Sequence, residues 1–188
     1  FKEHEMVKRM LSEDIKFPAG KRPNLSLETL ELVTRIDQIG RSSTDITDVC
    51  WRMLYYANLV LRREPISLVE IGGGIGEFYA LIRALGYKGD YFIYDLPEVT
   101  SFQQEYLRVV QERTGLQLLP FTLKYDFCIS FYALGEFDDN LKSGYIENVV
   151  KKCPHGVIVW NPHSGASTEI PFDCLVTEQY DGSKLLLW

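Results

Sequence analysis

Three glycines at alternate positions make residues 68–78, LVEIGGGIGEF, the segment best suited to hold a ligand. A short apolar run precedes Gly72, Gly74 and Gly76, and an amphipathic pattern typical of a helix follows them. Glycine is required where the backbone takes a positive φ or where a ligand lies against the main chain. Ligands of open α/β sheets bind at the carboxyl ends of the strands. This turn therefore predicts a floor without Cβ atoms for a ligand that carries a nucleoside.

The residues around the turn argue against two common phosphate-binding motifs. A P-loop requires Gly-Lys-Ser or Gly-Lys-Thr, and neither tripeptide occurs in the sequence. A dinucleotide fingerprint counted from Gly72 needs a third glycine where Glu77 stands. That carboxylate would also repel a pyrophosphate bound at the positive end of the helix. The pattern is instead E-x-G-x-G-x-G, and it begins at Glu70.

A second acidic residue ends the next predicted strand. In YFIYDLPEV, residues 91–99, Asp95 follows an apolar run and stands 19 residues after Gly76. A carboxylate at the end of a strand beside a glycine turn can accept hydrogen bonds from both hydroxyls of a ribose. Asp95 is therefore a candidate ribose-binding residue.

These two segments resemble the class I S-adenosylmethionine-dependent methyltransferases, and the glycine turn matches motif I of that family. The resemblance implies that the turn lies under the methionine and ribose parts of S-adenosylmethionine. It also implies that Glu70 organises the turn and the amino end of the cofactor, that Asp95 binds the ribose, and that Leu96 packs near the adenine. The cofactor carries a sulfonium and an ammonium cation and no phosphate, which suits an acidic cleft. Residues 119–125 lack the polar residue that often reads the adenine amino group, so that contact is unassigned.

The segment 125–165 is expected to form the acceptor side of the cleft. It is similar to a loosely defined group of sugar O-methyltransferases, in which a serine-rich turn with a glutamate follows one strand and an asparagine ends the next. The matching residues are Ser130, Glu136 and Asn161, and we expect Ser130 to lie at the cofactor. Such domains also occur fused to glycosyltransferases. The resemblance therefore implies a sugar or glycan hydroxyl as the methyl acceptor.

Methyl transfer to a hydroxyl is a displacement that needs an aligned acceptor oxygen and a base. His163 follows a predicted strand and has a suitable pKa range, although it is equally consistent with a loop histidine in water. Glu136 is the second candidate, as a base or as a hydrogen-bond anchor for a sugar hydroxyl. It is equally consistent with a carboxylate at the start of a helix. The catalytic base is thus left between these two residues.

Other polar and aromatic residues have a structural interpretation that we favour over a functional one. Asp138 and Asp139 could bind Mg²⁺, but adjacent acids before a helix are more often an N-cap and a first-turn charge, so no metal is expected. Arg41 could reach the cofactor carboxylate, but we favour a solvated loop arginine. Trp160 could stack on a sugar ring, but we favour a place in the core.

The hydrophobic periodicity changes between residues 64 and 65. Residues 1–64 predict a helical region, with one helix over Leu27–Ile39 capped by Ser26 and another that opens at Thr44 or Asp45. Residues 65–188 alternate strands and helices, which indicates βαβ units and a parallel sheet. The predicted strands are 66–71, 91–94, 116–119, 127–130 and 157–160, followed by a hairpin at Asp181–Gly182.

The family resemblance implies more than this pattern alone. We expect an α/β fold with a Rossmann-like class I methyltransferase sheet, parallel except for a terminal antiparallel hairpin, with helices on both faces. The helices of residues 1–64 would form an N-terminal cap, and residues 65–188 the methyltransferase core, within one compact domain.

Composition narrows the setting of the protein. The 188 residues carry a net charge of −6 with no dense basic stripe, so nucleic acid is not an expected partner. No apolar stretch approaches the ~20 residues that span a bilayer. The cysteines form no CxxC pair, which favours buried free thiols in a reducing compartment such as the cytoplasm. Because the sequence begins at Phe1 without a signal-peptide pattern, we expect a piece of a longer chain.

The sequence therefore predicts an S-adenosylmethionine-dependent O-methyltransferase that acts on a sugar or glycan hydroxyl. One alternative is a methyltransferase for another small molecule or a protein side chain. Another is a domain that binds the cofactor without turnover. An NAD-linked oxidoreductase ranks third, because Glu77 stands where the last glycine of its fingerprint would be.

Overall fold

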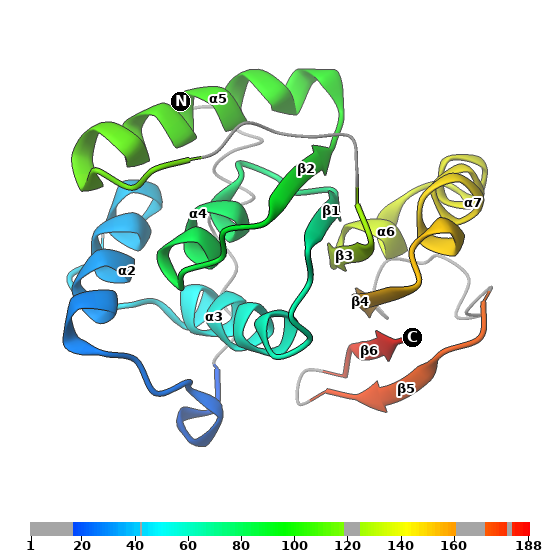
Figure 1. Cartoon of the computed structure of the whole chain (residues 1–188), viewed down its shortest axis with the longest axis horizontal. Coiled ribbons are helices and arrows are strands. Elements are labelled where there is room, and N and C mark those ends of the chain that lie inside the picture. Colours follow the sequence, from blue (N-terminus) through cyan, green and yellow to red (C-terminus); the bar gives the residue numbers. More distant parts are fainter. Residues whose placement is uncertain (1–16, 42, 119–124, 161–171, 180–181) are drawn as a thin grey trace. The chain divides into compact units, whose positions relative to one another are not determined.

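The computed structural model describes residues 17–41, 43–118, 125–160, 172–179 and 182–188 (Figure 1). The chain divides into two compact units that interleave along the sequence. The helical unit comprises Phe1–Glu64, Gly74–Lys88 and Leu96–Leu119, and the sheet unit comprises Pro65–Gly73, Gly89–Asp95 and Pro120–Trp188. The glycine turn contributes residues to both units, because the boundary falls between Gly73 and Gly74.

The described part of the sheet unit contains six strands in the order β2-β1-β3-β4-β6-β5. They are β1 (Ser67–Ile71), β2 (Asp90–Tyr94), β3 (Phe127–Phe131), β4 (His155–Trp160), β5 (Leu175–Glu178) and β6 (Lys184–Leu187). The first four are parallel, whereas β6 runs antiparallel to both β4 and β5. The predicted α/β class with a parallel sheet and an antiparallel end is therefore confirmed.

The predicted strand 116–119 is wrong over its described residues, because residues 116–118 form no strand. The preceding helix ends at Thr114, and its C-cap residue Gly115 has a positive φ of 73°. The Leu116 amide then donates to the Thr114 hydroxyl at 3.2 Å, so this amide is occupied locally and not by a sheet ladder. Residues 116–118 therefore follow directly from the end of a helix.

The core of the sheet unit lies between the sheet and three short helices, α6 (Ala133–Glu136), α7 (Asp139–Asn148) and the 3₁₀ turn η2 (Val150–Lys152). Val69 and Ile71 of β1 pack with Ile158 and Trp160 of β4 and with the inner faces of these helices. Trp160 is 2% exposed, which confirms its place in the core. This packing fixes the carboxyl ends of β1 and β3 relative to each other.

Asp138 is the N-cap of α7, as the sequence predicts. Its side chain accepts hydrogen bonds from the amides of Asn140 and Leu141 at 3.0 and 2.9 Å. The helix ends at Asn148, and the 3₁₀ turn η2 follows after Val149. The backbone of Val149 departs from helical geometry there, with φ −124° and ψ −62°.

The helical unit consists of the 3₁₀ turn η1 (Ala19–Lys21), α2 (Leu27–Gly40), α3 (Asp48–Leu61), α4 (Glu77–Ala84) and α5 (Pro97–Thr114). Ser26 caps α2 by accepting a hydrogen bond from the Thr29 amide at 3.2 Å, as predicted. The prediction for the start of α3 is wrong: Thr47 is its N-cap, two to three residues later than expected. The cause is tertiary, because Asp37 of α2 accepts hydrogen bonds from both the amide and the hydroxyl of Thr47.

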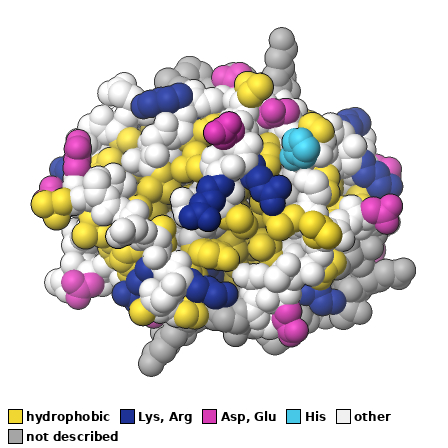
Figure 2. Space-filling model, turned by 60° about the horizontal axis from the view of Figure 1, so that its bottom comes forward, with side chains coloured by type: hydrophobic (Ala, Val, Ile, Leu, Met, Phe, Trp, Pro, Cys, Tyr) yellow, Lys and Arg dark blue, Asp and Glu magenta, His cyan; other side chains and the backbone are white. Residues whose placement is uncertain are grey.

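All four cysteines are free, and Cys50, Cys128 and Cys153 are buried as predicted, whereas Cys174 is half-buried. Within the described ranges, no helix is both long and apolar enough to cross a bilayer. On the face that Figure 2 shows, lysine and arginine side chains stand among hydrophobic and uncharged ones, with acidic side chains nearby.

Candidate functional site

The glycine turn begins with a tight bend at the end of β1. The Gly72 amide donates to the Tyr94 carbonyl at 2.7 Å, and Gly72 has a φ of +73°. A Cβ atom at Gly72 would lie 2.1 Å from the Cβ of Ala133 in α6. Glycine is therefore required here both by the backbone conformation and by close packing against α6.

The other glycines of the turn also occupy positions that disfavour a side chain. A Cβ atom at Gly73 would lie 2.7 Å from Ile93 and 2.9 Å from a carboxylate oxygen of Glu70. Gly74 and Gly76, which belong to the helical unit, have φ values of +55° and +86°. The three alternating glycines predicted from the sequence thus all occupy the left-handed region.

Glu70 is buried at the end of β1, with 2% of its surface exposed. The Tyr91 hydroxyl of β2 donates to its carboxylate at 2.7 Å. Burial raises the pKa of Glu70 to about 8, with the nearby Asp95 charge adding to the rise and the Tyr91 hydrogen bond opposing it. The sequence did not indicate this raised pKa, because it depends on burial.

Asp95 directly follows β2, at the level where the glycine turn leaves β1. The register pairs Ile71 with Tyr94, and the Gly72 amide binds the Tyr94 carbonyl, so Asp95 and the turn begin side by side. Asp95 is half-buried, and its charge acts on both Glu70 and Tyr145. The sheet unit therefore brings the two acidic residues of the predicted site to one end of neighbouring strands.

Leu96, the predicted adenine contact, is the first residue of its segment in the helical unit and the N-cap residue of α5. Its side chain is 46% exposed, which is high for a leucine. An exposed leucine directly after Asp95 is consistent with an apolar contact to a ligand, and that contact stays a prediction.

Ser130, which the sequence places at the cofactor, is held by hydrogen bonds within the sheet unit. Its side chain is fully buried, donates to the Ile71 carbonyl at 2.9 Å and accepts from the Leu134 amide at 3.2 Å. The hydroxyl thus joins the end of β1 to the start of α6. These bonds favour a role in positioning the glycine turn over direct contact with a ligand.

Of the two candidate bases, Glu136 lies within the described residues and His163 does not. Glu136 is exposed at the last residue of α6, two positions before the N-cap of α7. His163 and Asn161 lie outside the described residues, so their expected places beyond β4 stay predictions.

Between β3 and α6, Tyr132 takes a positive φ of 68°, an unusual conformation for a bulky residue.

An aromatic groove in the sheet unit was missed by the sequence analysis. It has a volume of about 510 Å³ and is lined mainly by Tyr94, Tyr125 and α7, with Tyr145 facing Tyr94 at a ring-centroid distance of 6.0 Å. Asn140 and Asn148 add amide groups to its lining. The sequence contained a weak signal for it, because Tyr94 immediately precedes the candidate ribose-binding residue.

Arg41 is neither solvated nor in an open loop, which corrects the interpretation favoured from the sequence. Its side chain is 7% exposed and forms ion pairs with Asp37 of α2 and Glu77 of α4, all within the helical unit. Burial raises the pKa of Glu77, and the charge and hydrogen bond of Arg41 act in the opposite direction. Arg41 is therefore the counterion of two buried carboxylates.

These carboxylates also belong to a possible metal-ligand set. Among the described residues, Asp37, Cys50 and Glu77 place a ligand atom each within 4.8 Å of one another. The Arg41 guanidinium already pairs with both carboxylates, so the cluster has its cation without a metal. This arrangement favours a structural role for the cluster over metal binding.

The topology defines the class of fold: a Rossmann-like α/β sheet, with β1 between β2 and β3 in its parallel part and an antiparallel end. No protein-family model matches the chain, and no curated protein matches it in sequence.

Solved structures do match it. A protein assigned as an O-methyltransferase from Nostoc punctiforme PCC 73102 is 11% identical with a TM-score of 0.53, over 97% of this chain and 66% of that one. Magnesium protoporphyrin IX methyltransferase from Synechocystis PCC 6803, solved with bound S-adenosylmethionine, is 12% identical with a TM-score of 0.50, over 88% and 98%. At these identities the similarity is one of fold.

Proposed function

We propose that the chain binds S-adenosylmethionine and transfers its methyl group to a hydroxyl of a small molecule, with a sugar or glycan as the acceptor. The observation that carries this proposal is the joint origin of the glycine turn and Asp95. The Gly72 amide binds the carbonyl of the residue just before Asp95, so a bare main chain and a carboxylate start at the same point. A nucleoside ligand needs both features in that arrangement.

Each residue of this proposal has a separate task. Asp95 accepts hydrogen bonds from the ribose hydroxyls, and the exposed side chain of Leu96 packs against the adenine. A positive charge near Glu70 would lower its raised pKa and favour the carboxylate. The bound cofactor supplies such a charge in its sulfonium group, which also carries the electrophilic methyl group. Either Glu136 or His163 takes the proton of the acceptor hydroxyl as the methyl group moves.

The aromatic groove supports a sugar as the acceptor. Its volume of about 510 Å³ lies within the usual range for small-molecule sites, and tyrosine faces with asparagine amides suit the apolar faces and hydroxyls of a sugar ring. Asp95 acts electrostatically on Tyr145 in this groove, so the groove and the predicted ribose site are close.

The setting of the enzyme is part of the same proposal. Three buried free thiols support a reducing compartment such as the cytoplasm. The resemblance to sugar O-methyltransferases supports a longer protein in which glycosyltransferase domains accompany this one. It also supports a division into a helical region of residues 1–64 and a methyltransferase core of residues 65–188.

Calorimetric titration with S-adenosylhomocysteine tests the cofactor assignment. The wild type and Asp45→Ala, which removes an exposed carboxylate far along the chain from the turn, are expected to bind equally. Asp95→Ala is expected to bind about tenfold more weakly or worse, since a hydrogen bond to a charged group contributes ~1.5–3 kcal/mol. Absence of binding by the wild type would refute the proposal.

Transfer of a labelled methyl group to a panel of free, nucleotide-linked and glycan-linked sugars then tests the reaction. Product with at least one sugar is expected. Binding without product on any acceptor would instead favour a domain that binds the cofactor without turnover. Product only with other small molecules or with protein side chains would overturn the sugar assignment and leave the methyltransferase assignment intact.

A further inference from the structure

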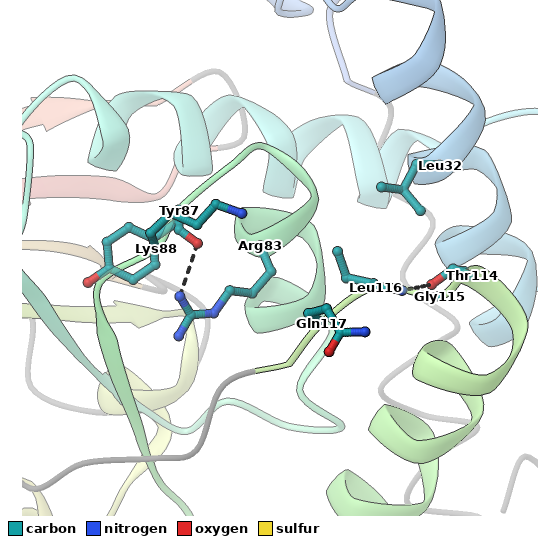
Figure 3. A pocket seen from close by; sticks show the side chains of 8 residues that line it. All are labelled: Leu32, Arg83, Tyr87, Lys88, Thr114, Gly115, Leu116 and Gln117. Atoms are coloured by element: carbon teal, nitrogen blue, oxygen red, sulfur yellow. Dashed lines mark hydrogen bonds between the residues drawn. The ribbon is translucent and has the colours of Figure 1, made fainter.

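A pocket in the helical unit has a buried arginine in its wall. Its volume is about 270 Å³, and it is lined by residues of α2, of the end of α4 with the segment after it, and of the end of α5. Figure 3 shows the Arg83 side chain between Tyr87 and Lys88 on one side and Leu116 and Gln117 on the other. All of these residues belong to the helical unit, so the pocket is formed within one compact part of the chain.

The contacts of Arg83 leave one edge of its guanidinium unused. The residue is 4% exposed, and its guanidinium lies 5.0 Å from the ring centroids of both Tyr79 and Tyr87. Its Nη1 donates to the Tyr87 carbonyl at 3.0 Å. Its Nε and Nη2 are buried and have no hydrogen-bond partner among the described residues. Buried donors without an acceptor cost free energy, so this edge needs a physical explanation.

The helix ends explain why a cation lies here, but they do not supply an acceptor for that edge. Arg83 is in the last turn of α4, and Gly115, the C-cap residue of α5, also lines the pocket. Each helix end carries a partial negative charge of about half a unit. Two such ends offset about one of the two positive charges of Arg83 and Lys88, and none of the described lining residues is acidic. The balance favours a ligand with one negative charge.

The shape of the unused edge and of the pocket narrows the kind of anion. The parallel N–H groups of Nε and Nη2 match the two oxygens of a carboxylate. Leu32, Leu116 and the Tyr87 ring give the pocket apolar walls, and a volume of about 270 Å³ suits a small molecule. We propose that this pocket binds a small carboxylic acid with an apolar body, whose carboxylate accepts hydrogen bonds from Nε and Nη2 of Arg83.

This pocket is separate from the glycine turn. Gly76 is the N-cap of α4, and Arg83 follows seven positions later, about 10 Å further along the helix. The inference therefore does not depend on the proposed function. Because Nε and Nη2 are shielded from solvent, the acid must displace a lining side chain to reach them. Lys88 and Gln117 are exposed, so they are the lining side chains that can move aside.

The test compares acids with their neutral amides in ligand-observed NMR titrations. Butyrate, benzoate and phenylacetate are each paired with the amide of the same carbon skeleton, and inorganic phosphate is titrated separately. The wild type is expected to bind at least one acid about tenfold more tightly than its amide, the factor expected for hydrogen bonds between charged partners. Phosphate, which has no apolar body and more than one charge, is expected to bind more weakly than that acid.

Two variants and a matched control locate the binding. Arg83→Gln keeps a donor for the Tyr87 carbonyl but removes the charge and the second edge, so the preference for the acid should disappear. Lys88→Gln, at an exposed side chain, should lower the preference about two- to fivefold. Arg62→Gln makes the same chemical change as Arg83→Gln at an exposed arginine outside the pocket, and its preference should equal that of the wild type.

The preference is a ratio measured within each variant, so a partly unfolded sample does not change it. Equal binding of every acid and its amide by the wild type, or no binding of any acid, would overturn the inference. So would an unchanged preference in Arg83→Gln, or in Lys88→Gln if Arg83→Gln does not fold. Tighter binding of phosphate than of every acid would overturn the assignment to a carboxylate.

Discussion

Two glutamates flank the glycine turn, seven positions apart, and both are buried, yet they have opposite kinds of partner. Glu77, after the glycines, is paired with the Arg41 guanidinium. Glu70, before them, accepts a hydrogen bond from the neutral Tyr91 hydroxyl and feels the negative charge of Asp95. Glu77 therefore already has its counterion within the protein.

Glu70 has no cation among the described residues that act on it, and burial raises its pKa to about 8. The difference suggests distinct roles for the two acids. A buried acid with a resident arginine stabilises the helical unit, because its charge is balanced before any ligand arrives. A buried acid that lacks a cation is costly to ionise, and a cationic ligand would relieve that cost. Glu70 thus has the electrostatics expected of a residue that meets a sulfonium or ammonium group.

The largest expected effect comes from removing the resident cation. Arg41→Met leaves Asp37 and Glu77 buried together without a counterion, so the free energy of unfolding is expected to fall by about 3–5 kcal/mol. Urea denaturation at pH 7 measures this change. Arg41→Lys is the control and should lose much less. A loss below ~1 kcal/mol in Arg41→Met would show that the ion pairs contribute little.

The next effect sharpens the contrast at Glu70. Because its pKa is about 8 in the folded chain and near 4.5 when unfolded, the folded state binds the extra proton between these pH values. Stability should therefore fall as the pH rises from 5 to 8, by on the order of 3 kcal/mol from this group. Glu70→Gln, which cannot ionise, should show a flatter curve in denaturation experiments. Parallel curves for the two proteins would contradict the raised pKa.

Binding of S-adenosylmethionine should favour the deprotonated form of Glu70. If a sulfonium cation lies near this carboxyl, its pKa falls, so a proton is released on binding at pH 7 and affinity rises toward pH 8. Calorimetry in two buffers with different ionisation enthalpies counts the released protons. S-adenosylhomocysteine has no sulfonium charge and should release fewer. Equal proton release by wild type and Glu70→Gln would assign the effect to another group.

The smallest effect is expected at Tyr91, the neutral hydrogen-bond partner of Glu70. Tyr91→Phe removes the hydrogen bond that opposes the rise in the pKa of Glu70, so that pKa should increase further. The lost bond is expected to cost about 1 kcal/mol of stability near pH 8, where the carboxylate begins to form. The measurement is the pH dependence of the unfolding midpoint. A shift of the stability curve toward lower pH would contradict this assignment.

Much of the site near the sheet was predictable from local sequence. The glycines mark positive φ angles, and Asp95 follows an apolar run whose length identifies the strand before it. The same holds for the cap at Ser26, since capping depends on residues three positions apart. Such features need only neighbours in the chain.

The remaining features depend on residues far apart in sequence. Arg41 meets Glu77 across 36 positions, and the start of α3 is set by Asp37 ten positions earlier. Ser130 reaches the Ile71 carbonyl across 59 positions, so its hydroxyl links β1 to the helix that follows β3. The aromatic groove likewise joins Tyr94 to Tyr145 through the packing of α7. No local pattern reports such pairs.

The sequence by itself determined where the backbone must bend and which strands and helices follow, because steric freedom and hydrophobic period are properties of short segments. It also placed an acid at the end of the second strand. Only the tertiary structure decided which acids are ionised, because charge in the interior depends on burial and on partners that folding brings together. Glu70 and Glu77 are the same residue type in the sequence, and their different partners in the fold give them different electrostatic environments.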